Sequence, residues 1–355
     1  MRVGTFVLAA QFPGQGRGEA LHRAVRTAEI AEETGLDSVW LAEHHFVPYG
    51  VCPSAVTLAA LLLGRTRRIG VGTAVSVLPN AHPVALGEQA ALLHITSGGR
   101  FSLGVGRGGP WIDLEVFGSG IGAYESGFPE SLDLLLRWLR EPAVGADGER
   151  YRFRAVDVVP RPADLLESPL LLEAPARPGG PAPHPEVVVA CTSPGGVRTA
   201  GERGLPMLLG MHCDDEEKAE MVALWRRHAL AAGHSPDDVA AAGHVSAGVV
   251  QLDDRAGDAR ERLLKAMPGW LRLGLGAHRT VDDRTRAMRD PVAYTELLCS
   301  LHPVGPPRLA ADRLAATAER TGITRFALLA EGSGDPAATE ATLRGLAGEV
   351  LPLLV

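Results

Sequence analysis

The sequence is poor in cysteine and offers no basis for a disulfide framework. Only four cysteines occur among 355 residues, at Cys52, Cys191, Cys213 and Cys299, and no two of them form a C-x-x-C pair. This spacing argues against a zinc ribbon and against a disulfide-stapled mini-protein. With 46% hydrophobic residues, the chain can bury a sizeable core without such staples. We therefore expect four reduced thiols, a cytoplasmic location and no metal site.

Long hydrophobic runs are missing too, and so is an excess of positive charge. No stretch approaches the roughly 18 consecutive apolar residues of a transmembrane helix. The short apolar run Val3–Ala9 is better explained as a buried strand than as a signal peptide. The formal net charge of −7 gives no general electrostatic attraction to nucleic acid or to an anionic membrane. We expect neither of them as a partner.

Several catalytic signatures are also absent. The chain has no H-E-x-x-H motif, no EF-hand loop and no G-x-S-x-G nucleophile elbow. The segment Gly104–Gly109 does match G-x-G-x-x-G. It follows the fourth predicted strand rather than the first, and the residues after it do not begin a regular helix. A dinucleotide-binding role for this segment is therefore rejected.

The chain does contain an alternation of apolar strand-like runs and amphipathic helical stretches. Eight strands are predicted, at Val3–Leu8, Ser38–Ala42, Arg68–Leu78, Phe101–Val105, Glu186–Cys191, Met207–Gly210, Val245–Leu252 and Phe326–Ala330. The first helix covers Glu19–Thr34 and is ended by Gly35, the second begins at Pro53, and the third begins at Pro83 and ends before Gly98. Such an alternation indicates a parallel sheet with both faces covered.

The number of strands favours an α/β fold of the (β/α)₈ type, a TIM barrel, as a single domain over residues 1–355. Such a barrel typically needs ~250 residues. Two insertions account for the excess: Pro142–Pro185 after strand four, and Gly269–Pro307 between strands seven and eight. A doubly wound open sheet is the alternative, although it would prefer fewer strands and a phosphate loop after the first strand.

Polar residues that follow strands are the candidate functional residues, because active sites of parallel barrels lie at the carboxyl ends of the strands. His44 and His45 follow the second strand, and an imidazole with a near-neutral pKa suits acid–base chemistry. Two ordinary loop histidines bonded to carboxylates are the alternative.

Two further strand ends suggest an anion site. Arg107 follows the fourth strand among glycines and suits a phosphate, unless it pairs with a neighbouring carboxylate. Ser193 follows the fifth strand and opens a helix whose free amides favour an anion, although a plain capped helix is the commoner case. Arg107 and Ser193 together make a more credible phosphate site than either residue alone.

Seven segments, in order along nearly the whole chain, carry a specific similarity. They are Gly35–Phe46 (GLDSVWLAEHHF), Val71–Pro79 (VGTAVSVLP), Ala81–Val84 (AHPV), Gly99–Phe101 (GRF), Arg107–Gly108, Glu202–Pro206 (ERGLP) and Pro303–Gly305 (PVG). Together they resemble the bacterial luciferase family of flavin-dependent monooxygenases. The similarity is greater to the alkanal-oxidising luciferase subunits than to the deazaflavin-dependent branch.

The resemblance implies a (β/α)₈ barrel that binds reduced FMN at its C-terminal mouth. In this family reduced FMN reacts with O₂ to give a flavin hydroperoxide, which oxygenates an organic substrate while the second oxygen atom leaves as water. The pocket has to be dry, because water would release hydrogen peroxide prematurely. The implied function is a monooxygenase that receives reduced FMN from a separate flavin reductase and acts on a small organic molecule, for example one of secondary metabolism.

The resemblance also carries over roles to individual residues. His44 matches the family's catalytic histidine, which handles protons. Ala74 and Val75 match a non-proline cis peptide that lies against the isoalloxazine ring. Arg107 and Ser193 match contacts to the flavin phosphate.

Three positions depart from the family's pattern. Gly106 replaces the reactive cysteine of the luciferase catalytic subunit, so thiol chemistry is not expected there. Thr192 stands where a glutamate is usual, and Gly196 where a threonine donates to the phosphate. We keep both as cofactor contacts and expect weaker phosphate binding. The loop between strands seven and eight, the family's substrate lid, aligns poorly, which argues against a fatty aldehyde substrate and against light emission.

A homodimer is expected as well. The helices Pro53–Leu63 and Pro83–Ile95 have Ala/Leu faces that are too apolar for solvent. In the family, the residues that His45 and Glu88 match meet across the subunit interface.

Two other functions stay open. A deazaflavin-dependent oxidoreductase would transfer a hydride without oxygen. A non-catalytic flavin-binding partner subunit would have no activity of its own, and the retention of His44 argues against it.

Overall fold

Eight parallel strand positions close into a barrel in the computed structural model of this chain, which describes residues 1–170, 182–282 and 289–354. Closure follows from the pairing of β3 with β5, which joins the two ends of the strand order. This confirms the predicted TIM barrel and excludes the open sheet, because a closed barrel leaves no edge strand. The barrel strands are β1 (Arg2–Val7), β2 (Ser38–Leu41), β3 (Gly70–Thr73) continued by β4 (Ser76–Val77), β5 (Phe101–Gly106), β8 (Glu186–Cys191), β9 (Met207–Leu209), β10 (Val245–Val249) and β13 (Arg325–Leu329).

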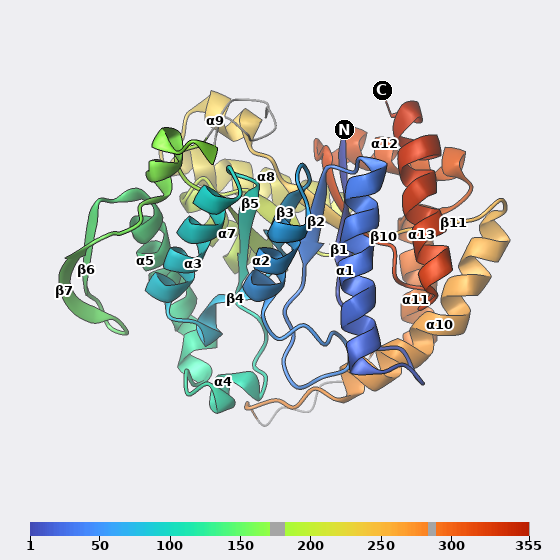
Figure 1. The fold of residues 1–355 in the computed structure, drawn as a ribbon, viewed down its shortest axis with the longest axis horizontal. Helices are drawn as coiled ribbons and strands as arrows, with labels where there is room; N and C mark the ends of the chain where they lie inside the picture. Colours follow the sequence, from blue (N-terminus) through green and yellow to red (C-terminus); the bar gives the residue numbers. More distant parts are fainter. Residues whose placement is uncertain (171–181, 283–288, 355) are drawn as a thin grey trace.

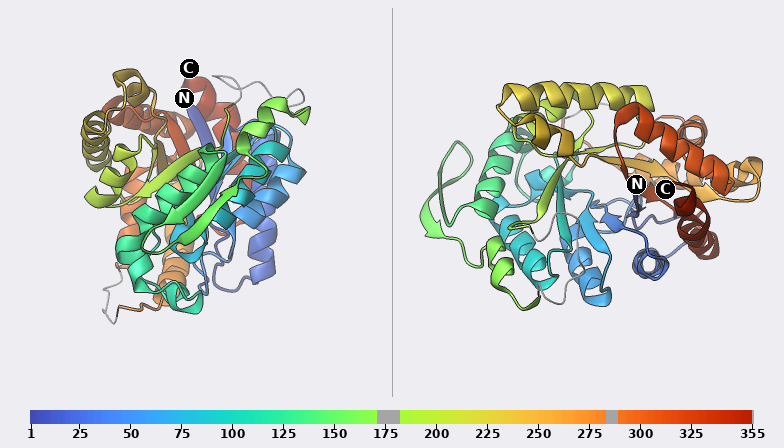
Figure 2. Two further views of the ribbon diagram at one scale, coloured as in Figure 1. Left: turned by 90° about the vertical axis from the view of Figure 1, so that its left-hand side faces the viewer. Right: turned by 90° about the horizontal axis from the view of Figure 1, so that it is seen from above.

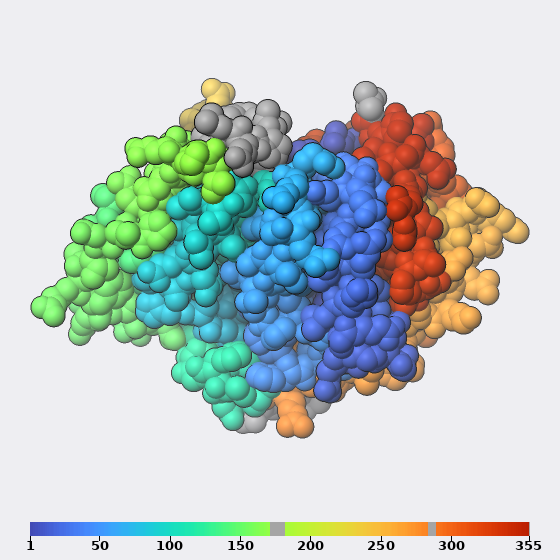
Figure 3. Space-filling view, viewed as in Figure 1, coloured from blue at the N-terminus to red at the C-terminus, as the bar shows by residue number. Residues whose placement is uncertain are grey.

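Helices surround the barrel, as the views in Figures 1 and 2 show. In Figure 3 the blue to cyan segments, which include α1, α2 and α3, form a broad front. The longer helices are α1 (Arg17–Thr34), α2 (Ala55–Arg65), α3 (Pro83–Thr96), α5 (Phe128–Arg140), α7 (Pro194–Glu202), α8 (Asp215–Ala231), α10 (Ala256–Gly276), α11 (Pro291–Leu301), α12 (Pro307–Thr321) and α13 (Pro336–Gly345). Two short helices are α4 (Asp113–Val116) and α9 (Pro236–Ala241).

Local signals set the helix ends. Gly35 adopts φ of +81°, and its N–H donates to the carbonyls of the last turn of α1, as predicted. The second helix begins at Ala55 rather than at Pro53, because the Ser54 hydroxyl caps it by accepting a hydrogen bond from Thr57 N. The third helix begins at Pro83 and ends before Gly98, as predicted.

Two predicted strands are interrupted. The run Arg68–Leu78 is divided into β3 and β4 by Ala74 and Val75, which are joined by a cis peptide bond. The run Val245–Leu252 divides into β10 and β11 (Gln251–Leu252), and β11 leaves the barrel to pair with β12 (Val304–Gly305). An apolar run does not reveal that its end changes sheets, since both parts are buried.

The two insertions contain regular structure. The first holds an antiparallel hairpin of β6 (Ala143–Asp147) and β7 (Arg152–Asp157), which projects at the left of Figure 1. Most of its Pro/Gly-rich stretch, residues 175–181, lies outside the described residues. The second begins within α10 and includes α11 and β12.

The barrel has two hydrophobic layers. Along β2, Val39 and Leu41 face the layer between strands and helices, while Trp40 packs with the other inward-facing residues. Gly72 makes room for Trp40, because a Cβ atom there would lie 2.7 Å from the indole. At the amino ends of the strands, Arg325 donates to both carboxylate oxygens of Glu186, at 2.5 and 2.8 Å. This pair closes one end of the barrel, so the space for a ligand lies at the other.

The predictions about cysteines and about membrane-spanning helices can be compared with the structure. The four cysteines are all free thiols. No helix within the described ranges is both long and apolar enough to cross a membrane.

Candidate active site

A cavity of about 390 Å³ lies at the carboxyl ends of the barrel strands. This volume is within the usual range of small-molecule sites. Its walls are mostly apolar, with a few polar side chains. The lining residues are Phe6, Leu8, Ala42, Glu43, His44, His45, Tyr49, Ala74, Val75, Val77, Gly108, Gly109, Trp111, Asp113, Ala190, Thr192, Leu208, Gly210, Met211, His212, Ala247, His278 and Tyr294.

His44 lies in this wall just after β2, where the sequence predicts a catalytic residue. Its backbone N–H donates to the Cys52 carbonyl at 2.9 Å, which fixes the loop. The imidazole meets the ring of Tyr49 edge-on, with centroids 5.0 Å apart. Its Nδ1 atom is buried and has no hydrogen-bond partner among the described residues. A buried ring nitrogen without a partner is costly unless a ligand or water engages it.

The environment keeps His44 neutral. Burial, followed by the charges of His278 and His45, lowers the pKa of His44 to about 3. The sequence-based expectation of a near-neutral pKa is therefore corrected. At pH 7 one ring nitrogen of His44 carries a proton and the other is an acceptor.

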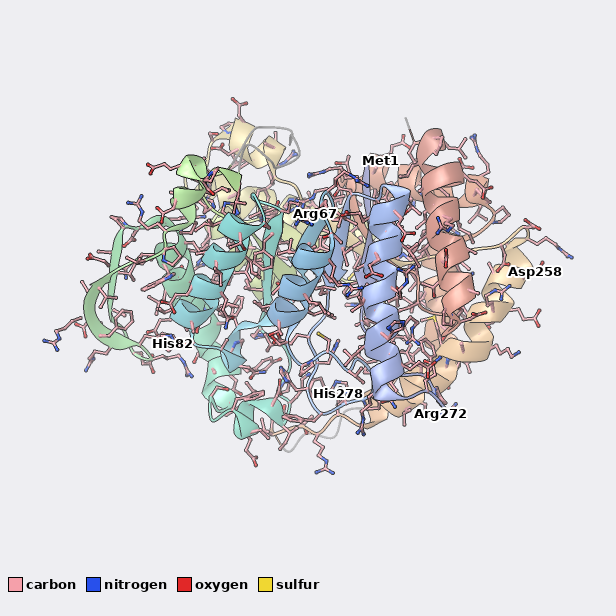
Figure 4. The ribbon with its side chains drawn as sticks, in the orientation of Figure 1. Met1, Arg67, His82, Asp258, Arg272 and His278 are labelled. Atoms are coloured by element: carbon pink, nitrogen blue, oxygen red, sulfur yellow. The ribbon has the colours of Figure 1, made fainter. Side chains whose placement is uncertain are left out.

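Tyr49 forms an aromatic wall beside His44. Its ring stacks on Trp270 with centroids 4.9 Å apart and planes 5° apart, and Trp270 Nε1–H donates to the Tyr49 carbonyl at 2.9 Å. Gly274, one turn after Trp270 on α10, allows this approach, because a Cβ atom there would lie 2.6 Å from the Tyr49 backbone. The same end of α10 leads to His278, whose ring lies 4.7 Å from that of Trp111. Figure 4 shows His278 among the loops at the lower end of the barrel.

The Ala74–Val75 peptide bond is cis, as the resemblance implies, and both residues line the cavity. The break between β3 and β4 places this bond against β5. Thr73 Oγ1–H donates to the Gly104 carbonyl at 2.6 Å, and the Val75 side chain packs against Gly106. Contact of this bond with a flavin ring stays a prediction.

Two carboxylates occupy the wall near β2 and β5. Glu43 accepts hydrogen bonds from Ala55 N at 3.1 Å and Val77 N at 3.0 Å, so it ties the start of α2 to β4. Asp113 is 6% exposed and accepts one hydrogen bond from the Asn80 amide at 2.7 Å. The second Asp113 oxygen, Oδ1, is buried without a partner in the part of the chain that the structure describes.

The predicted phosphate contacts lie near the cavity, but only Thr192 is among its described lining residues. Arg107 is exposed, and its guanidinium lies 4.3 Å from the ring centroid of Tyr124. No carboxylate of the described ranges lies within 4.0 Å of Arg107, so the alternative of an ion-paired arginine is not observed. Ser193 caps α7 by accepting a hydrogen bond from Gly196 N at 3.4 Å. That amide is therefore already engaged, as in a plain capped helix.

Within one chain, the two predicted interface residues, His45 and Glu88, have different surroundings. His45 Nε2 is 3.5 Å from Glu43 Oε1, and the His45 ring contacts Phe117 at 5.0 Å between centroids. Glu88 is exposed on α3. A meeting of His45 with the Glu88 of a second copy stays a prediction.

Several lining residues were not found from the sequence. Tyr49, His212, His278 and Tyr294 carry no local signal, since they belong to loops or to the poorly aligned segment. Asp113 could have been noticed as a polar residue shortly after β5. No group of three or more potential ligands among the described residues could hold a metal ion.

Comparisons with known proteins agree with this architecture. A family model described as luciferase-like monooxygenase matches residues 1–325. The alkanal monooxygenase alpha chain of a Kryptophanaron alfredi symbiont is 28% identical over 371 residues, covering 100% of this chain and 98% of that relative.

Solved structures share the fold at low sequence identity. Monooxygenase RslO1 from Streptomyces bottropensis superposes with a TM-score of 0.81 at 22% identity, covering 100% of both chains. The oxygenating constituent of 3,6-diketocamphane monooxygenase from Pseudomonas putida, in complex with FMN, gives 0.75 at 22% identity and covers 100% of this chain and 99% of its own. An F420-dependent secondary alcohol dehydrogenase gives 0.69 at 15% identity, covering 100% and 99%.

Proposed function

The chain belongs to the luciferase-like monooxygenase family, and on this premise we propose that it is an FMN-dependent monooxygenase that uses reduced FMN and O₂ to oxygenate a small organic substrate. Family membership confirms the resemblance seen in the sequence. The observation that carries the finer proposal is His44: a neutral imidazole with an unpartnered Nδ1 in the wall of a largely apolar cavity.

The residues present fit a flavin. The flat apolar walls suit an isoalloxazine ring, which would lie against Ala74 and Val75. The exposed guanidinium of Arg107 and the start of α7 at Ser193 would hold the phosphate outside the cavity. The buried Oδ1 of Asp113 and Nδ1 of His44 are polar atoms that a ligand would satisfy. When bound, reduced FMN supplies the electrons that activate O₂.

The chain's own residues would manage water and protons. Tyr49, which stacks on Trp270, and Trp111 line the cavity and would limit the access of water to the reacting centre. His44 would hold a proton on one ring nitrogen and accept one on the other during the reaction. Its low pKa keeps it uncharged before the substrate arrives, which also suits an apolar cavity.

The partners proposed are a flavin reductase and a second copy of the chain. We assign the reduction of FMN to a separate enzyme because the resemblance to the luciferase family implies it. The outer face of α2 and α3 exposes Leu61 by 49% and Leu92 by 53%, and it lies in the front of Figure 3. We propose that this face forms a homodimer interface.

The decisive experiment compares two reduced cofactors. The purified chain is titrated without oxygen with reduced FMN and, separately, with a reduced deazaflavin, and each mixture is then exposed to O₂. Free reduced FMN reacts rapidly with O₂ without an enzyme, so the proposal expects tight binding of reduced FMN and a time course of its oxidation that the chain alone changes relative to free reduced FMN. Preferential binding of the deazaflavin, with no O₂ consumption, would identify a hydride-transferring oxidoreductase. Binding of reduced FMN without any change in its reaction with O₂ would identify a non-catalytic subunit.

A further inference from the structure

The cavity is electrically asymmetric. Its described lining includes two carboxylates, Glu43 and Asp113, and both belong to the side formed by β2 and β5. Each already accepts hydrogen bonds from its own chain, as described above. Across the barrel, the wall after β9 and on α11 presents His212 and Tyr294 and, among its described residues, no acid. β9 lies opposite β2 in the closed strand order.

Two basic side chains, those of Arg289 and Lys218, lie close to this second wall. The Arg289 guanidinium is exposed and lies 5.2 Å from the Tyr294 ring centroid, at the edge of this wall. Lys218, on α8, is only 2% exposed. It is close enough to lower the pKa of both His212 and His302, as Arg289 does for His212.

Three carboxylates act on Lys218, those of Asp215, Asp214 and Glu217, and Glu217 also acts on His212. Each of them accepts a hydrogen bond elsewhere: Glu217 Oε2 accepts from Asp214 N at 3.0 Å. Asp214 caps α8 by accepting from Glu217 N at 2.8 Å, and Asp215 accepts from the Thr317 hydroxyl at 2.8 Å. Within the described ranges, no carboxylate lies within 4.0 Å of Lys218 or Arg289. Burial lowers the pKa of Lys218, and Asp215, Asp214 and Glu217 oppose that shift from beyond contact distance. No acid is therefore in direct contact with the ammonium within the described ranges, which leaves a negative ligand free to approach this wall.

The polar groups that reach the cavity are hydrogen-bond donors. Burial raises the pKa of the Tyr294 phenol, so it stays protonated and can donate its O–H. Burial and the neighbouring cations lower the pKa of His212, so it is neutral and offers one N–H. Donors backed by cations suit an oxygen that carries negative charge.

We propose that Tyr294, His212 and Arg289, with Lys218 behind them, form a subsite for an anionic oxygen of the substrate, a carboxylate or phenolate on a flat apolar body. The body would lie against Tyr49 and Trp111, in the same cavity. This proposal shares one assumption with the proposed function, namely that the cavity receives an organic substrate. It is separate from the phosphate contacts, which belong to the ends of β5 and β8.

A direct binding experiment tests the subsite without flavin or turnover. Fluorine NMR measures the affinity of 4-fluorobenzoate, of pentafluorophenol above and below its own acidic pKa, and of the neutral isostere 4-fluorobenzamide. The variants are Arg289→Gln and Tyr294→Phe. Arg67→Gln is the matched control, because Figure 4 places Arg67 at the end of the barrel opposite His278. Thermal unfolding checks that each variant is folded, and inorganic phosphate serves as competitor.

The subsite predicts that the wild type binds benzoate or the phenolate about tenfold or more tightly than the amide, as expected for charge-assisted hydrogen bonds. Arg289→Gln and Tyr294→Phe should each remove most of this preference, while Arg67→Gln keeps it. Equal affinity for acid and amide, absence of binding by both anions, or a preference that survives in both variants would overturn the proposal. So would displacement of the anion by inorganic phosphate, which would place it at the flavin phosphate site. Loss of reduced-FMN binding in the cofactor titration bears on the proposed function and leaves this result standing.

Discussion

The position that a Cβ atom would take on Gly106 lies 2.6 Å from Cγ2 of Val75. The valine of the cis pair therefore fills the space beside the end of β5 that a side chain at position 106 would need. Val75 lines the cavity, whereas Gly106 lies behind it and is not among the described lining residues. This close approach is the physical reason for a glycine at position 106.

Gly106→Ala should destabilise the fold by ~1–3 kcal/mol, because the added methyl group overpacks a filled site. Adding Val75→Ala should recover most of that loss, since it removes the clashing methyl groups. Urea unfolding of the two single variants and the double variant measures the coupling. Gly257→Ala is the control, because nothing lies within 4 Å of its Cβ position. Additive effects of the two substitutions would show that the pair is not coupled.

Arg107→Ala should weaken binding of reduced FMN by about 10- to 100-fold, the usual effect of losing a charge-assisted contact of ~1.5–3 kcal/mol. Reduced FMN should bind better than oxidised FMN to the wild type. Anaerobic titration measures both affinities, with Arg67→Ala as the control for the loss of one positive charge. An unchanged affinity in Arg107→Ala would remove this residue from the site.

His44→Ala should reduce product formation by ~10²–10⁴-fold, the usual contribution of general acid–base catalysis. Binding of reduced FMN should stay nearly intact, because the proposed phosphate contacts are elsewhere. Hydrogen peroxide released per reduced FMN consumed should rise. Paired assays of product and peroxide test this. Since the pKa of His44 is lowered to about 3, its titration should cause no inflection in the rate between pH 5 and 8. Wild-type rate and coupling in the variant would make His44 a structural residue.

The chain should be a dimer in light scattering at micromolar concentration, and Leu92→Arg should make it a monomer. Leu92 is 53% exposed on α3, and an arginine there would place an unpaired charge in an apolar interface. Leu353→Arg is the matched control, because Leu353 is exposed to a similar extent, 46%, near the C-terminus. A monomeric wild type would overturn the proposed dimer. In the dimer, cysteines at positions 45 and 88 should form a disulfide between copies.

Stability should fall as the pH drops below about 6.5. Burial lowers the pKa of His302 to about 3 and that of His244 to about 4, whereas in the unfolded chain a histidine titrates near 6.5. Between these values the unfolded chain binds protons that the folded chain does not, so acid favours unfolding by up to ~1.4 kcal/mol per pH unit for each such histidine.

The variant His302→Gln tests whether stability falls with decreasing pH for this reason. The amide can still donate to the Met211 carbonyl, which now accepts from His302 Nε2 at 2.6 Å. Urea unfolding at pH 5 and pH 7 should show a smaller pH dependence in this variant. His22→Gln, at an exposed position of α1, should leave the dependence as in the wild type. An equal pH dependence in all three proteins would contradict the assignment.

The sequence by itself determined the barrel and the place of the site. Strand and helix periodicity, the Gly35 cap and the prolines that begin helices act over a few neighbouring residues, so they can be recognised without the fold. Residues after β2, β5 and β8 had to gather at one end, because parallel strands in a closed barrel all point the same way. The cis peptide came only through resemblance to a family, whereas Arg107 and Ser193 were also indicated as phosphate contacts by their places after strands.

Only the tertiary structure decided what the cavity contains and how its groups titrate. Tyr49, Asp113, His212 and Tyr294 come from four separate loops or helices, and no local pattern brings them together. The low pKa of His44 arises from burial and from His278, which is more than two hundred positions away along the chain. β11 likewise leaves the barrel because its partner, β12, is contributed by the segment before α12. Such properties depend on packing between distant segments, which strand and helix patterns do not encode.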